Sequence, residues 1–568
     1  MALLMACCST AASALDRHAF TFTKYDLDVR IEPEQQRFAV RGKITLRNDS
    51  GTPQKNAVLQ ISSSLNWSSI RFQGKPLEFI SQTYTSDIDH TGALRQAIVS
   101  LPHAIAAKEN LELELGYEGL ILLDSTRLKR IGVPAEVANR SDWDQIGQAF
   151  TAIRGVGHVT WYPIGTEAVN FSEGNSVSTE ISRWKQREAE SAMQVNLCLL
   201  SADNTVAVMN DATPGASHTE TENAGFSCSM HSFPQLGDTI PTCVIGNYLS
   251  FEHSGVEIRY LKDHKSGADN YTEVLNETAP FVSRLFGEPL RAGALRHVLD
   301  LPDSEAEPFE SGNTLLIPLM TKDSNLFLSA IQQLVHASFW SPRAWIREGV
   351  ARYTQLALLR ERGSRQTVVE FLQGRQDALL ASETDLATVS EDDSAGNSLL
   401  NSDDDFLVQT KAGYVWWMLG DIVGDQALRS ALRNYRAGED KLPDYLQKLI
   451  EAQSHRDLEW FFDDWVYRDR GLPDFRIVSV FPRALVSGGY MVTVLVENLG
   501  DAGGEVPVTV LTEHREVSQR LEVQRKSRAS VRIPVGTLPI EAIVNDGSVP
   551  ESDISNNRFK IQPPITGH

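Results

Sequence analysis

The feature that most constrains the fold of this chain is its hydrophobic periodicity, which changes twice. From Tyr25 to about residue 260, short segments such as YDLDVRIEP and LELELGYEG alternate apolar and polar residues between Asn, Asp, Gly and Pro turns. This alternation predicts β-strands that bury one face. From residue 270 the apolar residues recur at helical spacing, and after Arg476 the alternation returns. We therefore predict a β region, a mainly helical region and a second β region.

The middle region carries clear helix boundaries. Its first helix begins near Asn270 and ends at Gly287, because the sequence Gly-Glu-Pro does not continue a helix. An apolar segment over 308–320 predicts one buried edge strand. Five further helices are predicted, over 324–340, 343–362, 365–382, 407–421 and 426–436.

The last region contains strand-like segments about ten residues apart, such as YMVTVLVENLG and EVPVTVLTEH, a spacing typical of a small β-sandwich. A chain of 568 residues is also too long for one hydrophobic core. We predict a multidomain α+β protein with a signal-like segment, an N-terminal β domain, a mainly helical domain and a β-sandwich. These parts are expected at residues 1–15, 16–260, 261–475 and 476–568.

The formal net charge of −21 argues against a nucleic-acid partner, because phosphate binding requires clustered Lys and Arg side chains. Acidic residues are concentrated in two stretches: residues 390–405, and a turn that holds Asp546, Glu551, Asp553 and Asn556. Each could bind calcium, but a solvated loop and a hairpin turn are the preferred interpretations. After the amino terminus, no uncharged apolar run is long enough to predict a membrane span.

The amino-terminal segment is small and apolar, and Ala12, Ser13 and Ala14 form an A-x-A cleavage signal of the secretory kind. The residues that end at Cys7 also resemble a bacterial lipobox, in which Cys7 would carry a lipid anchor. No Lys or Arg precedes Arg17, so the positive region of a signal peptide is missing. Either route predicts an extracytoplasmic protein, and the alternative is a cytoplasmic tail.

Three cysteines follow the amino-terminal segment, and an odd count allows at most one disulfide among them. We expect Cys228 and Cys243 to bridge adjacent strands in an oxidising compartment, with buried free thiols as the alternative. The spacing of the three, with Cys198, fits no zinc site.

The helical stretch IQQLVHASFWSPRAWIREGVARY has part of the residue spacing of a zinc site. In H-E-x-x-H, two histidines one turn apart bind zinc, and the glutamate between them acts as a general base. Here Gln332, Gln333 and His336 occupy those three positions, and Glu348 follows where a third ligand is expected. A lone histidine on an apolar helix is otherwise an ordinary core residue, so other segments must support the interpretation.

Five segments together resemble the M1 family of zinc aminopeptidases (gluzincins), in the family's order and over roughly residues 20 to 475. These segments are YDLDVRIEPEQQRFAVRGKITLRNDS, TWYPIGTEA, WIREGVARY, LVQTKAGYVWWML and LEWFFDDWVYRDRGLP. The resemblance implies an N-terminal β saddle domain and a thermolysin-like, mainly helical peptidase domain. The tail, with its turn E-S-D-x-x-N-N, resembles a CARDB-type Ig-like domain, which implies a bacterial extracytoplasmic protein.

The resemblance also assigns roles to single residues. The family's first zinc-binding histidine falls on Gln332, its general base on Gln333, and the tyrosine that supports the oxyanion on Gln409. His336 and Glu348 remain as metal ligands. The segment PFESG replaces the family's G-x-M-E-N loop and places Glu310 where the substrate amino terminus is bound.

These substitutions remove chemistry that the reaction requires. Zinc lowers the pKa of bound water from ~15.7 to ~7, and the general base then takes a proton, a step worth ~10²–10⁴ in rate. A glutamine amide is neutral and has no basic site, so only two good ligands remain where a catalytic zinc takes three. We therefore predict a noncatalytic scaffold, with no cofactor, that binds a peptide or protein. The alternative is a zinc metallopeptidase whose site another residue completes, such as His297.

Overall fold

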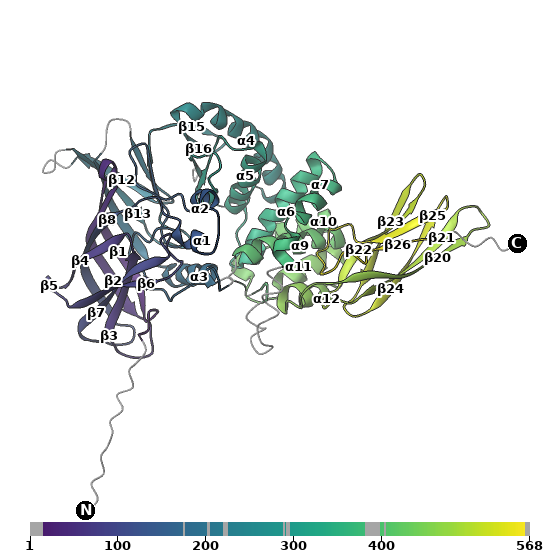
Figure 1. Ribbon diagram of the computed structural model, residues 1–568, viewed down its shortest axis with the longest axis horizontal. Helices are drawn as coiled ribbons and strands as arrows, with labels where there is room; N and C mark the ends of the chain where they lie inside the picture. Colours follow the sequence, from purple (N-terminus) through teal and green to yellow (C-terminus); the bar gives the residue numbers. More distant parts are fainter. Residues whose placement is uncertain are drawn as a thin grey trace, which may run out of the picture. The chain divides into compact units, whose positions relative to one another are not determined.

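The computed structural model describes residues 15–173, 176–200, 205–219, 225–287, 290, 296–380, 398–400, 402 and 405–562 (Figure 1). The proposed signals at Cys7 and Ala14 lie outside the described residues, as does most of the acidic stretch 390–405. The chain divides into two compact units. Unit 1 comprises residues 1–271 and 295–322, and unit 2 comprises residues 272–294 and 323–568.

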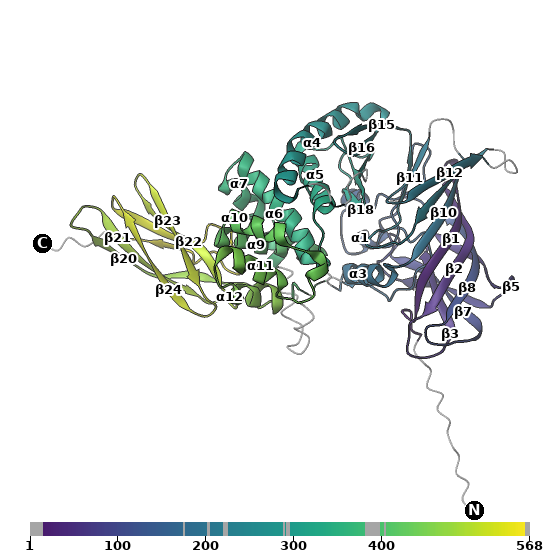
Figure 2. The same cartoon turned by 180° about the vertical axis from the view of Figure 1, so that it is seen from behind.

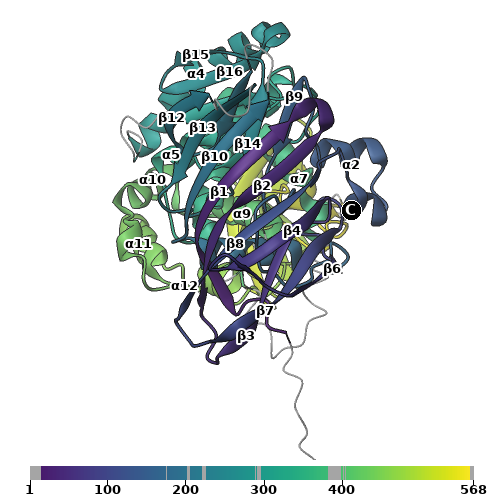
Figure 3. The same ribbon diagram turned by 90° about the vertical axis from the view of Figure 1, so that its left-hand side faces the viewer.

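The core of unit 1 is an eight-stranded sheet in the order β12-β13-β10-β1-β2-β8-β4-β5, whose central strands lie side by side in Figure 3. All neighbours are antiparallel except β1 and β10. The predicted alternation is confirmed in β1, where Tyr25, Leu27, Val29 and Ile31 are buried. The strands are β1 (Phe20–Glu32), β2 (Arg37–Asn48), β4 (Leu65–Phe72), β5 (Lys75–Pro76), β8 (Asn110–Leu120), β10 (Ala192–Leu200), β12 (Thr213–Thr219) and β13 (Phe226–Phe233).

The segment TWYPIGTEA lies in the core beside this sheet. Trp161 and Tyr162 are fully buried, and the hydroxyl of Tyr117 donates to the backbone oxygen of Trp161. The indole of Trp161 donates in turn to the backbone oxygen of Pro241 at 3.1 Å. A second sheet joins the same core, with β3 (Gln54–Ser62), β7 (Ala93–Ile105) and β6 (Phe79–Thr85).

Two smaller sheets complete unit 1. The first contains β11 (Val206–Met209), β14 (Cys243–Gly246) and β9 (Phe150–Ile153). The second contains β15 (Tyr248–His253), β16 (Val256–Leu261), β17 (Arg296–Asp300), β19 (Thr314–Ile317) and β18 (Phe309–Ser311), in that order. The single edge strand predicted over 308–320 is wrong, because β18 and β19 form a hairpin that turns at Gly312, where φ is +59°.

Three helices lie within the region that we predicted as all-β: α1 (Thr126–Arg130), α2 (Ala135–Ser141) and α3 (Ser176–Glu188). In α3, Val177, Glu180, Trp184 and Glu188 are buried at a helical spacing. The prediction missed α3 because two of these four inward-facing side chains are carboxylates, which weakens its apolar pattern.

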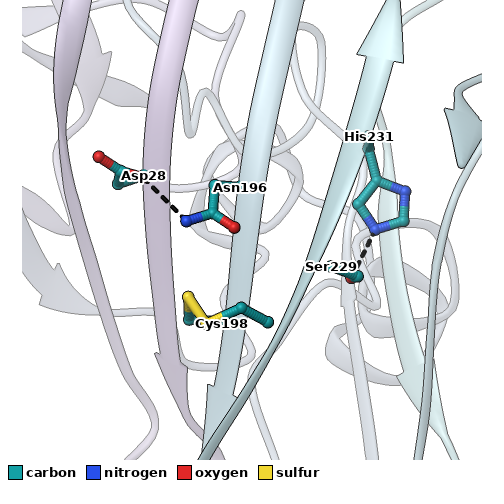
Figure 4. Close-up of a disulfide and its surroundings, with 6 residues drawn as sticks. Asp28, Asn196, Cys198, Ser229 and His231 are labelled. Carbon is teal, nitrogen blue, oxygen red and sulfur yellow. Dashed lines mark hydrogen bonds between the residues drawn. A yellow bond between two sulfur atoms is a disulfide. The ribbon is translucent and has the colours of Figure 1, made fainter. Parts of the chain in front are cut away.

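The disulfide differs from the prediction. Cys198 of β10 bonds to Cys228 of β13, directly across the sheet with Cα atoms 4.0 Å apart (Figure 4). Cys243 is a buried free thiol on β14, in another sheet, and burial raises its pKa to about 12. The expected Cys228–Cys243 bridge is therefore wrong, because strand register places Cys198, and not Cys243, opposite Cys228.

The helices of unit 2 follow the predictions closely, and α6, α9 and α10 lie together (Figure 2). The predicted helices at 324–340, 343–362, 407–421 and 426–436 each agree with an observed helix within two residues at either end. The helix predicted over 365–382 is wrong in extent, because α7 ends before Gly374 and residues 376–380 form a separate helical segment. The helices are α5 (Asp323–Ser338), α6 (Ala344–Arg362), α7 (Arg365–Gln373), α9 (Asp405–Val423), α10 (Asp425–Asn434), α11 (Tyr445–Ser454) and α12 (Glu459–Phe462), and the end of α4 (Lys265–Phe286) also belongs to unit 2.

Residues 475–560 form two antiparallel sheets, β20-β21-β24 and β23-β22-β25-β26, at the positions predicted for the sandwich. Valines at alternate positions, including Val492 and Val494 of β21, are fully buried, whereas the residues between them are only partly buried. The strands are β20 (Phe475–Ala484), β21 (Tyr490–Asn498), β22 (Gly504–Thr512), β23 (Glu516–Val523), β24 (Arg528–Val535), β25 (Pro539–Val544) and β26 (Arg558–Lys560).

The tail belongs to the same unit as the helices and is joined to them by partly buried ion pairs. Arg365 of α7 pairs with both Asp421 of α9, at 2.6 Å, and Asp546 of the tail, at 2.9 Å. Glu551 accepts hydrogen bonds from the side chain of Asn545, at 2.7 Å, and the backbone of Phe475, at 3.0 Å. The acidic side chains of Asp546 and Glu551 are thus engaged by protein donors.

Among the described residues, no helix has both the length and the apolar character that are needed to cross a membrane.

Candidate functional site

The turn between α5 and α6 brings His336 and Glu348 together. His336 lies in the last turn of α5, and Glu348 in the second turn of α6. The Nε2 atom of His336 lies 3.4 Å from Oε2 of Glu348. The two ligand positions that the family resemblance leaves occupied therefore lie next to each other.

Glu348 also has a strong partner on its own helix. Nε of Arg347 donates to Oε1 of Glu348 at 3.0 Å. Burial by itself would raise the pKa of Glu348, but the charges and hydrogen bonds of His336 and Arg347 outweigh burial and hold the pKa well below its usual range. The carboxylate is therefore charged, and protein cations balance its charge.

A second arginine lies one turn further along α6. Arg352 is largely buried, and burial together with the charge of Arg375 lowers the pKa of its guanidinium to about 10, while Glu348 acts in the opposite direction. The guanidinium donates to Oε1 of Gln355 at 2.7 Å, and Gln355 donates to the backbone oxygen of Leu328 on α5. The charge of Arg352 thus also acts on the carboxylate that would ligate a metal.

Gly349 of α6 and Gly413 of α9 allow these two helices to approach each other closely. A Cβ atom on Gly349 would lie 2.2 Å from Cδ1 of Trp416, and one on Gly413 would lie 2.7 Å from Cγ of Arg352. The indole of Trp416 donates to the backbone oxygen of Trp345 at 3.3 Å. The motifs WIREGVARY and KAGYVWWML therefore form one close-packed helix pair.

The three glutamines of the degenerate motif keep their predicted helical positions. Gln332 is half-buried and Gln333 is buried on α5, and Gln409 is half-buried on α9. Within the part of the chain that the structure describes, no three His, Cys, Asp or Glu side chains come close enough to hold a metal ion. Because His336 and Glu348 supply only two of the three ligands that a catalytic zinc takes, the residues present do not fit such an ion.

The other two predicted site residues, His297 and Glu310, belong to unit 1. Nδ1 of His297 lies 3.0 Å from Oε2 of Glu257, and burial lowers the pKa of this imidazole. Glu310 is half-buried in edge strand β18, where it pairs with Leu315. Burial is the largest cause that raises the pKa of Tyr271, and the charge of Glu310 is the second largest. The structure therefore gives His297 a carboxylate partner within its own unit.

Sequence reasoning missed a buried ionic network in unit 1. Arg127 makes a bidentate pair with Asp142, and Arg154 pairs with Asp144 at 2.7 Å. Burial and the charge of Arg154 lower the pKa of the adjacent His158 to about 4. The acidic residues of DWDQ and the basic residues of AIRGVGH could have indicated this network. Neither segment matches a known short motif, so the sequence did not single them out.

Comparison with solved structures identifies the fold of this chain. The M1 zinc metallopeptidase from Deinococcus radiodurans superposes with a TM-score of 0.50 and 15% sequence identity, over 80% of this chain and 96% of that one. The chain has the fold of the M1 zinc metallopeptidases. A mutant of the same enzyme gives a TM-score of 0.49 at the same identity and coverage.

At this identity, the likeness establishes the M1 fold alone. No family model matches the sequence, and no curated protein matches it. The activity of this chain must therefore be inferred from its own residues.

Proposed function

We propose that this protein is a noncatalytic, extracytoplasmic protein with the M1 fold that binds a peptide or protein ligand. One observation carries the proposal: the charge of Glu348 is balanced by Arg347, at 3.0 Å, while the imidazole of His336 lies 3.4 Å away. In a working zinc site, this carboxylate would be balanced by the metal.

Repulsion from the neighbouring guanidinium groups would weaken the binding of zinc at this site. Two unit charges about 4 Å apart interact by about 4 kcal/mol near a protein surface, and a divalent ion doubles that figure. A zinc ion beside Glu348 would be repelled by the guanidinium of Arg347, which contacts Glu348, and by the charge of Arg352. With Gln332 in place of a third ligand, the site offers too little attraction to offset this repulsion.

Loss of the general base supports the same proposal. Gln333 stands where the family resemblance places the proton acceptor, and a neutral amide has no proton-accepting function at neutral pH. Gln409 replaces the phenol that would donate to the developing oxyanion. Metal binding, proton transfer and oxyanion support are thus weakened together.

The proposed location outside the cytoplasm is supported by the Cys198–Cys228 disulfide, because such bonds persist in oxidising compartments. The two sheets of the tail support an Ig-like domain of the CARDB type. In a bacterial host, the protein should leave the cytoplasm, either cleaved after Ala14 or lipidated at Cys7. A Cys7→Ser change separates the two routes, because it abolishes membrane anchoring only for a lipoprotein.

The alternative function is a zinc-dependent aminopeptidase. One observation favours it, since 3.4 Å between the His336 and Glu348 atoms is also short enough for two ligands of one ion. This alternative requires a third ligand and a base, which Gln332 and Gln333 do not provide.

The deciding experiment measures metal content. We expect the purified wild-type protein, loaded with excess zinc and then desalted, to hold well under one zinc per chain by elemental analysis. It should also fail to cleave amino-acid amides and short peptides. Stoichiometric zinc together with chelator-sensitive peptidase activity would overturn the proposal and establish the alternative. The His336→Ala variant is the matched control, because any zinc bound at this site must fall when that ligand is removed.

A further inference from the structure

A pocket of about 340 Å³ lies within unit 1, and Glu310 is not among the residues that line it. Its walls come from two distant segments, 123–150 and 301–306. The volume lies within the range of about 300–1,000 Å³ that is typical of small-ligand sites. The pocket is large enough for a side chain of a bound peptide.

The floor of the pocket is apolar and firmly held. It includes Trp143, Phe150 and Leu301, all at most 7% exposed. The indole nitrogen of Trp143 donates to the backbone oxygen of Glu307 at 3.1 Å, and the guanidinium of Arg154 lies 3.8 Å from the centre of the indole ring. The two segments that form the pocket are therefore joined, and the aromatic floor is fixed before any ligand arrives.

The rim of the pocket carries an excess of negative charge. Arg140 lines the pocket, but an ion pair with Glu305 already balances its charge. Glu136 and Asp303 line the same pocket, and both are exposed. Two carboxylates above an apolar floor favour a ligand that has both an aliphatic stem and a positive end. The net charge of −21 also favours the approach of a basic partner.

The segment 120–137, which contributes Leu123 to the pocket, carries several exposed aliphatic side chains. Five exposed aliphatic side chains lie on one short segment: Leu120, Leu122, Leu123, Ile131 and Val137. Scattered exposed aliphatics are ordinary, whereas a concentration next to a pocket marks an interaction surface. The segment is also well anchored, since Arg127 pairs with buried Asp142 and Ser125 donates to Asn139 at 2.6 Å.

We propose that this pocket binds a Lys or Arg side chain of a peptide whose neighbouring apolar residues contact the segment 120–137. The methylene stem packs on the Trp143 and Phe150 floor, and the cationic end reaches Glu136 and Asp303 at the rim. This inference rests on the proposed binding function and names its ligand class. It does not depend on the zinc content of unit 2.

The test uses the full chain and two fluorescein-labelled nonapeptides, one that alternates leucine with lysine and one that alternates leucine with glutamine. We expect the lysine peptide to bind at least about tenfold more tightly by fluorescence anisotropy, with an affinity that falls as salt rises. The double variant Glu136→Lys and Asp303→Lys should lose this preference, with a fall in affinity of about tenfold or more.

A matched control separates the pocket from the general field of the protein. Glu513→Lys with Glu516→Lys changes the net charge by the same amount on exposed positions of the tail. This control should bind the lysine peptide within about twofold of wild type. Thermal melting of each variant confirms that it is folded, and both rim positions are exposed enough to accept lysine.

Two results would overturn the inference: equal binding of the two peptides, or equal losses in the rim variant and the tail control. Zinc content and peptidase activity are measured on the same samples. Stoichiometric zinc with activity would remove the noncatalytic proposal, whereas rim-independent binding without zinc would remove only the pocket.

Discussion

The imidazole of His336 and the carboxylate of Glu348 lie 3.4 Å apart, although they come from two different helices. In the same place, Arg347 donates to the other oxygen of that carboxylate at 3.0 Å. The geometry of a ligand pair has therefore been kept, while the charge that a metal would supply comes from the protein. This combination allows each missing part to be restored and tested separately.

Restoring the motif should restore metal before activity. Gln332→His with Gln333→Glu rebuilds H-E-x-x-H on α5, so zinc occupancy should rise towards one per chain by elemental analysis. Turnover of amino-acid amides should stay low until Gln409→Tyr is added, because the oxyanion would still lack its phenolic donor. Adding His336→Ala to the double variant is the control, and zinc that persists in it would show binding elsewhere.

Removing the competing guanidinium should strengthen metal binding in the rebuilt site. Arg347→Gln in the Gln332→His, Gln333→Glu background should lower the Kd for zinc by about tenfold or more, since a cation beside Glu348 is lost. In the wild-type background, the same change should cost about 1–3 kcal/mol in free energy of unfolding, because Glu348 loses a charged hydrogen bond. Zinc titration and urea unfolding measure the two effects, and an unchanged Kd would contradict the proposed competition.

The close approach of α6 and α9 predicts that Gly349→Ala destabilises the protein. The added methyl group would lie 2.2 Å from Cδ1 of Trp416, and overpacking of this kind costs about 1–3 kcal/mol. Gly438→Ala is the matched control, because nothing lies within 4 Å of the position of its added Cβ atom. Urea unfolding should show a lower midpoint for the first variant and little change for the second.

The buried Glu551 predicts a pH dependence of stability. Burial raises its pKa to about 7, against an ordinary value near 4.5, so between these two values the folded protein binds a proton that the unfolded chain releases. The contribution of Glu551 to stability should therefore be largest below pH 4.5 and fall by about 3 kcal/mol as the pH rises to about 7. Glu551→Gln mimics the protonated acid, so the difference between wild type and variant in urea unfolding should show this slope. A constant difference across the range would contradict the assignment.

The disulfide predicts a specific labelling pattern and a stability cost. In the unreduced, denatured chain, an alkylating reagent should modify Cys243 but neither Cys198 nor Cys228, as read by peptide mass spectrometry. Cys198→Ser with Cys228→Ser should lower the free energy of unfolding by about 3–4 kcal/mol, because the bond closes a loop with a sequence separation of 30. Labelling of Cys228 with protection of Cys243 would restore the pairing expected from the sequence.

Local patterns in the sequence were sufficient for most of the fold. The alternation in β1 and β21 and the helical spacing in α5 and α6 identified these elements, because a side chain's face depends only on its position in the repeat. The residue types of the degenerate motif were likewise visible, since Gln332 and Gln333 cannot supply an imidazole or a carboxylate wherever they lie.

Local periodicity was insufficient wherever two distant segments meet. The partner of Cys228 depended on the register between β10 and β13, and the pocket depended on the contact of segments 123–150 and 301–306. The same limit applied to His336, because its distance to Glu348 depends on how α5 and α6 pack. The sequence alone determined which chemical groups this protein has and which it lacks. Tertiary structure decided which of them stand within a few ångströms of each other, because such distances result from packing between segments that no local repeat encodes.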